Sequence, residues 1–296
     1  MGEIKIGVAG WDYKDWNGIV YPPAMKKPQR LEYLSQFFDV IEINTSFYGH
    51  IRPTSAQEWG RMVAGNPRFT FTAKLNRAFT HSPLAVTQPT SAETIRPNPN
   101  DERDAKAGLD ALMQEGKLGA LLVQFPISFK NTDANREYLE KLVGTFKQYP
   151  LVLEVRHETW NTEEMLAWLT KNEVGMCNID QPLLGRAVRP SEHTTSPIGY
   201  VRLHGRNYEQ WFTAEKPHDR YNYLYKQQEL EKWKPRIENV AEKAKVTFAI
   251  ANNHYQGKAA VNALQLKHLL SRQPKVPAPE SLVEHYPVLK SFAKPD

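Results

Sequence analysis

Charged side chains interrupt several short apolar runs in this 296-residue chain. The run LVLEVRHETW, residues 151–160, begins as a strand buried on both faces and then carries Glu154, Arg156 and His157 within four positions. Burying an ion costs several kcal/mol unless the ion is paired or takes part in chemistry. Carboxylates beside cations suit proton transfer or the binding of an anion.

Alternate residues of a strand point to opposite faces, so each run divides into two sets. One set is apolar and is expected to face surrounding helices: Ile41, Ile43, Phe71, Ala73, Leu121, Val123, Leu153, Val155, Cys177, Ile179, Val201, Leu203, Ala249 and Ala251. The other set is polar at the carboxyl ends of the strands: Glu42, Asn44, Lys74, Gln124, Glu154, Arg156, Asn178, Asp180, Arg202, His204 and Asn252. This polar set is predicted to converge around one axis.

The runs that must position these residues alternate with helical patterns. Eight runs predict strands, at residues 4–10, 40–44, 69–74, 119–124, 151–156, 175–180, 199–204 and 246–252. The link between the sixth and seventh runs is the weakest place for a helix. Eight repeats in about 250 residues favour an α/β fold, a single (β/α)8 TIM-type barrel spanning residues 1–296 with a C-terminal tail at 271–296.

Two long loops are expected, one after the third strand at residues 81–101 and one after the seventh at 205–225. Excursions that follow barrel strands lie on the face where this fold binds ligands. The polar ends of the strands and both loops are therefore predicted to form one site.

Cations at the strand ends predict an anionic ligand. Lys74, Arg156 and Arg202 face three carboxylates, and histidines at or beyond the rim make the expected pocket positive: His81, His157, His204 and His254. Arginine offers paired donors to a phosphate or carboxylate, and lysine a point charge. Aromatic residues expected at the same end suit a sugar ring or a nucleobase: Trp11, Tyr13, Trp16, Phe47, Tyr48, Phe125, Trp160 and Trp211. The alternative is that the ions are satisfied pairs that fill the barrel.

Three chemistries fit this pocket. In acid–base catalysis, Arg156 should lower the pKa of Glu154, while Glu42 or His204 carries the proton. A divalent metal could bind Glu154, Asp180 and His204, although nearby cations would repel it. A glycosidase would use Glu42 and Glu154 as its carboxylate pair. No phosphate-binding loop of the P-loop type and no G-x-S-x-G motif occur in the sequence.

Charge and composition limit the classes of molecule that this protein is expected to bind. The formal net charge of +5 is scattered along the chain, which favours anionic ligands only weakly, and a nucleic acid bound through the 81–101 loop is an alternative partner. The single cysteine, Cys177, is expected to be a buried apolar residue. The chain has no basic leader and no apolar run long enough to span a membrane, so a cytoplasmic location and no membrane partner are expected. No cofactor is predicted.

Several motifs, in order, resemble the YecE-like family, also known as domain of unknown function 72: GWDYKDWNGIVYP, IEINTSFYG, FTAKLNRAFTH, LLVQFP, LEVRHETW, YVRLHGR and ANNHYQGKAAVNA. The resemblance covers about residues 4 to 270. It implies a TIM-type barrel and no particular reaction. The pocket that it implies is lined by Trp11, Glu42, Asn44, Tyr48, Lys74, His81, Gln124, Glu154, Arg156, His157, Trp160, Arg202, His204 and Asn253. Val8 and Ala9 replace a Thr-Ser pair that members commonly carry, so a hydroxyl contribution is lost there.

These observations predict an enzyme, a hydrolase or isomerase, that acts on a small phosphorylated or carboxylated substrate. Arg156, Arg202 and Lys74 would bind the anion. The predicted catalytic residues are Glu42, Glu154, His204 and Asp180. The predicted binding residues, besides the three cations, are Trp11, Asn44, Tyr48, His81, Gln124, His157, Trp160 and Asn253. The alternatives are a metal-dependent phosphodiesterase or endonuclease-like barrel, and a protein that binds a nucleic acid or another ligand without catalysis.

Overall fold

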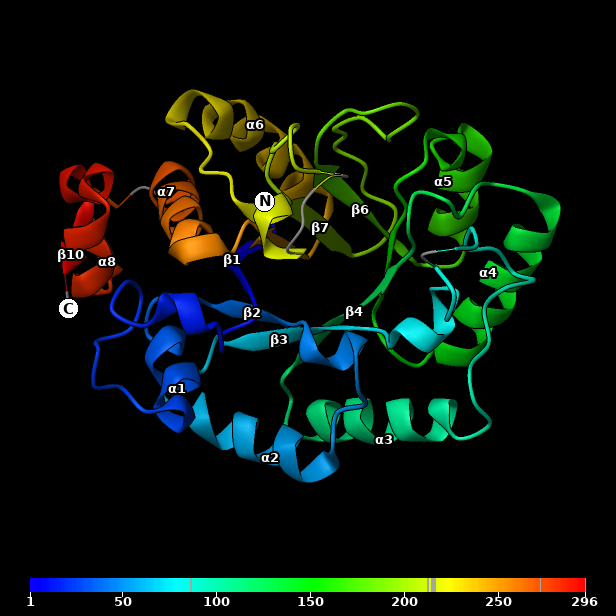
Figure 1. Cartoon of the computed structure of the whole chain (residues 1–296), viewed down its shortest axis with the longest axis horizontal. Helices are drawn as coiled ribbons and strands as arrows, with labels where there is room; N and C mark the ends of the chain where they lie inside the picture. Colours follow the sequence, from blue (N-terminus) through cyan, green and yellow to red (C-terminus); the bar gives the residue numbers. More distant parts are fainter. Residues whose placement is uncertain (86, 212, 214–216, 272, 296) are drawn as a thin grey trace.

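Eight parallel strands form a closed barrel in the computed structural model, which describes residues 1–85, 87–211, 213, 217–271 and 273–295 (Figure 1). Each strand is hydrogen-bonded to its neighbours in sequence order, and β1 pairs with β8 to close the ring. The strands are β1 (Glu3–Ala9), β2 (Val40–Ile43), β3 (Thr70–Lys74), β4 (Leu118–Gln124), β5 (Leu151–Glu154), β6 (Gly175–Asp180), β7 (Ile198–Leu203) and β8 (Val246–Ala251). The predicted (β/α)8 fold is confirmed.

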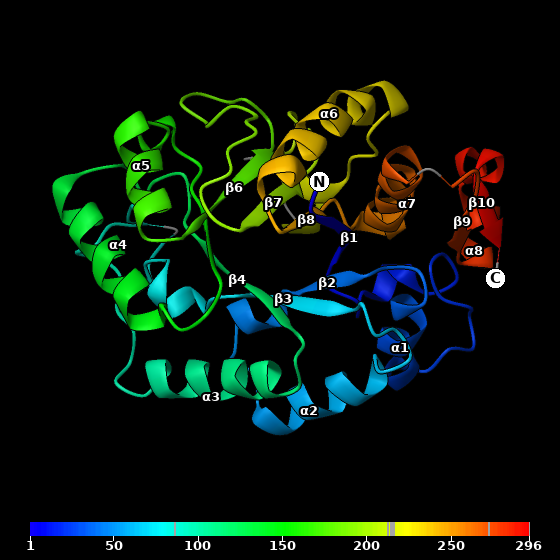
Figure 2. The ribbon, with the colours of Figure 1, turned by 180° about the vertical axis from the view of Figure 1, so that it is seen from behind.

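Helices surround the barrel, as the two opposite views show (Figures 1 and 2). They are α1 (Arg30–Ser35), α2 (Pro53–Met62), α3 (Asp101–Gln114), α4 (Asp133–Phe146), α5 (Glu163–Lys171), α6 (Gln227–Lys243), α7 (Lys258–Leu270) and α8 (Glu280–His285). Thr132 and Thr162 cap α4 and α5, because each hydroxyl accepts a hydrogen bond from a backbone N–H of the first turn. Residues 181–197, between β6 and β7, contain no helix, as the weak pattern there predicted. None of the helices in the described residues is long and apolar enough to cross a membrane.

The C-terminal segment packs against the barrel. Strands β9 (Val276–Ala278) and β10 (Ala293–Pro295) come before and after α8 in the sequence. They pair with each other in parallel. Val276, Leu282 and Leu289 are fully buried in the same apolar cluster as α7. The segment that the sequence suggested as a tail therefore forms part of the hydrophobic core.

Apolar side chains form two layers, one inside the barrel and one between the barrel and its helices. The outer layer contains the predicted outward residues of six strands: Ile41, Ile43, Phe71, Ala73, Leu121, Val123, Leu153, Val155, Val201, Leu203, Ala249 and Ala251. The inner layer contains large residues such as Leu122, Phe248 and Ile250. Alternation therefore predicts the facing of β2 to β5, β7 and β8 correctly.

Strand β6 has the opposite phase, so the prediction that Asp180 points to the barrel axis is wrong. Cys177 and Ile179 belong to the inner layer, and Met176 belongs to the outer one. Asn178 and Asp180 consequently point away from the axis. The sequence could not reveal this, because β6 carries apolar residues in both alternate sets.

Asp180 holds the outer side of β6 to its neighbours. Its carboxylate accepts hydrogen bonds from both the Nε and Nη2 atoms of Arg206, at 2.7 and 2.6 Å, and from the Tyr225 hydroxyl at 3.1 Å. The indole N–H of Trp233 on α6 donates to the same carboxylate. A buried indole N–H needs an acceptor, which this position of Asp180 supplies.

Replacing Asp180 with asparagine should lower the free energy of unfolding by about 2 to 3 kcal/mol, because Arg206 loses its paired acceptor. Asp133→Asn is the matched control, since Asp133 pairs with Arg136 at 2.6 Å but has a side chain that is 91% exposed. The control should lose about 1 kcal/mol or less. Chemical denaturation measures both, and equal losses would contradict the role given to Asp180.

Candidate functional site

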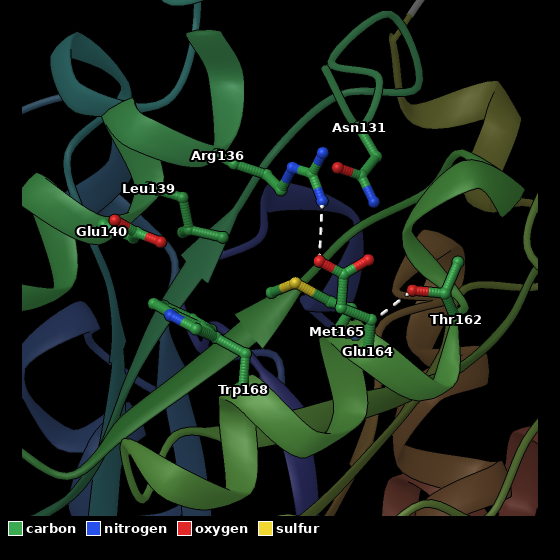
Figure 3. Close-up of a pocket in the computed structure, with 8 residues that line it drawn as sticks. All are labelled: Asn131, Arg136, Leu139, Glu140, Thr162, Glu164, Met165 and Trp168. Atoms are coloured by element: carbon green, nitrogen blue, oxygen red, sulfur yellow. Dashed lines mark hydrogen bonds and ion pairs between the residues drawn. The ribbon is translucent and has the colours of Figure 1, made fainter. Parts of the chain in front are cut away.

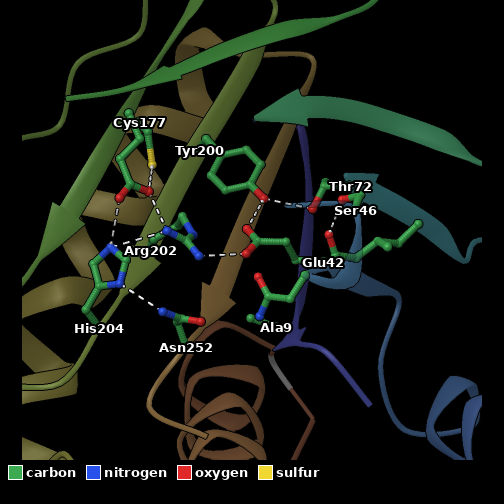
Figure 4. A network of polar contacts seen from close by, with 12 residues as sticks. Ala9, Glu42, Ser46, Thr72, Cys177, Tyr200, Arg202, His204 and Asn252 are labelled. Atoms are coloured by element: carbon green, nitrogen blue, oxygen red, sulfur yellow. Dashed lines mark hydrogen bonds and ion pairs between the residues drawn. The ribbon is translucent and has the colours of Figure 1, made fainter. Parts of the chain in front are cut away.

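A network of buried ions lies at the carboxyl end of the barrel (Figure 4). Arg202 on β7 donates to Glu42 on β2 at 2.6 Å and to Glu154 on β5 at 2.5 Å. All three side chains are fully buried. The structure thus brings these residues together, as predicted, but encloses them beneath the cavities described below.

Neutral side chains complete this network. The Tyr200 hydroxyl donates to Glu42 at 2.9 Å, and His204 lies 3.3 Å from Glu154. The amide of Asn252 donates to Nδ1 of His204 at 3.0 Å, so the proton of the neutral imidazole sits on Nε2 and points to Glu154. Burial lowers the pKa of His204 to about 3, which keeps the ring neutral at neutral pH.

Glu154 and Arg202 keep their charges near neutral pH. Burial alone would raise the pKa of Glu154, but Arg202, His204 and Arg156 together hold it well below its ordinary value. This confirms the predicted direction for Glu154. Burial lowers the pKa of Arg202, but the charges of Glu154 and Glu42 raise it well above its ordinary value. Glu154 is therefore an ionised, enclosed carboxylate, and its predicted catalytic role stays a prediction.

Arg156 connects the buried network to the surface. Its Nε and Nη2 atoms donate to Glu154 at 3.1 and 2.9 Å, and its side chain remains 15% exposed. Within the described part of the chain, Nη1 of Arg156 makes no hydrogen bond. The guanidinium is thus oriented from below and keeps donors for a ligand above.

A cavity of about 390 Å³ opens above Arg156. Its charged lining is cationic, from Lys74, Arg77, Arg156 and Arg220, and no Asp or Glu occurs among the lining residues that the structure describes. Burial and the nearby cations lower the pKa of His81, also in this wall, to about 3, so His81 is neutral. We call this space the basic cavity.

A second cavity, of about 270 Å³, adjoins the first. We call it the aromatic cavity, because its wall contains Trp11, Tyr13, Tyr48, Tyr221 and His254, together with Asn44 and Asn252. Tyr13 stacks on His254 with ring centroids 4.3 Å apart. Tyr48, Lys74 and Tyr221 line both cavities, which therefore form one site with two halves.

Lys74, at the end of β3, occupies the wall between the two halves. Its Nζ atom lies 4.3 Å from the centre of the Phe47 ring, and among the described residues it makes no hydrogen bond or ion pair. Burial, aided by the charge of Arg202, lowers the pKa of Lys74 to about 7. The carboxylates of Glu42 and Glu154 oppose this shift without reversing it.

Other predicted site residues lie elsewhere. Trp160 is buried and donates to the Phe129 carbonyl at 2.7 Å, His157 caps the turn at Glu158–Trp160 (η5), and the Asn253 amide donates to Asn262 at 2.7 Å. Of the three predicted metal ligands, Glu154 and His204 lie together, but Asp180 does not join them because it faces outward. The described residues contain no group of three or more His, Cys, Asp and Glu side chains that could hold a metal ion.

The structure adds lining residues that the sequence analysis missed, among them Arg77, Arg220, Tyr221, Thr45, Gln181 and Leu184, together with Asp12 in the aromatic cavity. Arg77 follows β3 within the motif FTAKLNRAFTH, and Arg220 lies in the predicted loop after β7. The sequence signal that could have identified both arginines is their position in a segment that follows a strand. Neither belongs to a strand, so alternation could not identify them.

A smaller hollow of about 100 Å³ lies on the helical shell between α4 and α5 (Figure 3). Its wall contains the surface ion pair of Arg136 and Glu164, with an N–O distance of 3.1 Å, beside Leu139, Met165 and Trp168. It shares no lining residue with the basic or the aromatic cavity. This hollow is therefore separate from the candidate site at the barrel mouth.

Comparison with known proteins identifies relatives over nearly the whole chain. The protein is 29% identical to the UPF0759 protein YunF of Bacillus subtilis strain 168, over 94% of this chain and 99% of the relative. A crystal structure of a DUF72 family protein from Thermotoga maritima MSB8 matches with a TM-score of 0.77 and 33% identity, covering 90% of this chain and 99% of that one.

A DUF72 family protein from Enterococcus faecalis V583 shares the fold, with a TM-score of 0.75 and 24% identity over 90% of this chain and 95% of that one. The family model described as "Protein of unknown function DUF72" matches residues 5–284. The resemblance seen in the sequence is thus confirmed, and the chain belongs to the DUF72 family.

Proposed function

We propose that this protein is an enzyme that binds a small phosphorylated or carboxylated substrate in the basic cavity and acts on it by acid–base or hydrolytic chemistry. The observation that supports this proposal is the charge of the lining: cations from three different strand ends and loops, and no carboxylate among its described members. A concave, cationic and partly dry space favours an anion over a neutral or cationic molecule.

The residues take different parts in this proposal. Arg156 binds the anion, and Glu154 is a positioning residue that orients the guanidinium from below. Arg77 and Arg220 add positive charge at the opening. Lys74 replaces Glu42 and His204 as the group that reacts near neutral pH, because it faces the ligand space while they are enclosed.

Gln124 and Asn44 line opposite halves of the site and offer amides to polar groups of the substrate. The aromatic cavity would hold an uncharged part of the substrate, such as a sugar ring, against Trp11 and Tyr48. This arrangement keeps the binding role predicted for these four residues. A nucleic acid bound over the outer surface would use other cations, and its binding would fall steeply with salt.

Arg156→Ala should weaken anion binding roughly tenfold to a hundredfold, which is the loss expected for a charge-assisted hydrogen bond. The assay is the rise in melting temperature with inorganic phosphate, small phosphate esters and small carboxylates. Arg136→Ala, on the helical shell, should keep the full response. The proposal fails if no anion stabilises the wild-type protein, or if both variants respond alike.

Lys74 should titrate with a midpoint near pH 7, about three units below the ordinary lysine value of about 10.4. Heteronuclear NMR of labelled lysine side chains follows this titration through the Cε shift. Lys74→Arg removes and thereby assigns the signal. A midpoint near 10 for the assigned signal would show that burial does not control this amine.

A further inference from the structure

We propose that Lys74 forms an imine with the carbonyl carbon of an anionic aldehyde or ketone whose charged group is bound by Arg156. This inference rests on the proposed function and names its substrate class. It assigns Lys74 to covalent catalysis, whereas the sequence alone suggested only a third cation for the anion.

Position is the first reason. Lys74 lines both cavities, whereas Arg156 lines only the basic one. A substrate whose anionic group meets Arg156 would place its next atoms toward the wall that the two cavities share. Its remaining atoms would continue into the aromatic cavity. The amine therefore stands where the middle of such a molecule would lie.

The partners of the other buried lysines give the second reason. Lys5, Lys117, Lys258 and Lys267 also have pKa values lowered by burial. Lys5, Lys117 and Lys267 each donate to a backbone carbonyl, at 2.5, 3.2 and 2.7 Å, and Lys258 donates to the side-chain oxygen of Asn222. Lys74 has no such acceptor among the described residues and instead lies over the Phe47 ring. Its amine is thus held against an aromatic ring at the cavity wall, without a hydrogen-bond acceptor among the described residues.

Reactivity is the third reason. A lysine attacks a carbonyl only as the neutral amine, and burial or neighbouring cations are the usual means of producing it. With a pKa of about 7, roughly half of Lys74 is neutral at neutral pH. Such an amine carries its positive charge only part of the time, whereas the arginines in the same wall stay charged and can bind the anion.

The step balances without any oxidant or reductant. The Nζ lone pair forms a bond to the carbonyl carbon while the C=O π electrons move to oxygen, and a proton passes from nitrogen to oxygen to give a carbinolamine. The C–O bond then breaks as the hydroxyl takes a further proton from solvent water and leaves as water. The nitrogen lone pair forms the C=N bond, and the resulting iminium draws electrons from the adjacent carbon.

Borohydride trapping tests this inference on the full chain. The probes are pyruvate, glyoxylate and glyceraldehyde 3-phosphate, each incubated with the protein and reduced with sodium borohydride to fix any imine as a secondary amine. Mass spectrometry should find one adduct per chain, and peptide mapping of the wild-type protein should locate it at Lys74. Labelling should increase with pH up to about 7 to 8 as the amine loses its proton.

Two variants sharpen the result. Lys74→Arg should lower adduct formation at least tenfold, because a guanidinium stays protonated and does not attack a carbonyl carbon. Lys117→Arg is the control for a buried lysine outside both cavities and should label like the wild type. Circular dichroism confirms that each variant is folded.

The outcomes of this experiment separate the imine from the anion site. Probes that stabilise the protein but leave no adduct at Lys74 overturn the imine while keeping the anion site. Adducts spread over surface lysines, or equal labelling of Lys74→Arg, also overturn it. If no probe and no phosphate raises the melting temperature and no adduct forms, the proposed function fails together with the inference.

Discussion

The ion pairs of Arg202 with Glu42 and Glu154 are the interaction on which the site depends. Three fully buried ions lose their hydration, and only close contact among them offsets that cost. Arg156 adds a second positive charge on Glu154, so two carboxylates and two guanidiniums sum to zero. The barrel can therefore enclose this network without a net charge. Its geometry then fixes the floor of the basic cavity, because Glu154 orients Arg156.

That balance also explains the behaviour of Lys74. A lysine beside a net negative centre would stay charged, since opposite charge raises the pKa of an amine. Here the attraction of Glu42 and Glu154 is countered by Arg202 and Arg156, and burial decides the direction of the shift. In the proposed function, an anion would therefore be recognised by Arg156 and the other cations that line the basic cavity. In the proposed function, the three enclosed ions would thus act on a ligand only by orienting Arg156.

Sequence reasoning reached the barrel and the convergence of Glu42, Glu154 and Arg202, because alternation is clear in strands with one polar and one apolar set. It failed at β6, where Met176 and Cys177 are both apolar and either phase is acceptable. Enclosure was also beyond reach, because it depends on how side chains pack around Arg202 in three dimensions. Ala9 is another position whose enclosure the sequence could not show. It lies buried in the inner layer, opposite Glu42 in the β1–β2 register (Figure 4). The hydroxyl lost there would have faced the enclosed network, not a cavity.

The reversed phase of β6 has a structural consequence at the cavity. Because Asp180 faces outward, it can bind Arg206 at the start of the long segment after β7, and Arg206 in turn pairs with Glu229 on α6 at 3.0 Å. The next residue, Asn207, donates to the carbonyl of Asp219 at 2.9 Å, which holds the far part of the segment beside its beginning. Arg220 follows directly and lines the basic cavity. An ionic centre outside the barrel therefore positions a cation inside the site, while the centre within the barrel positions Arg156.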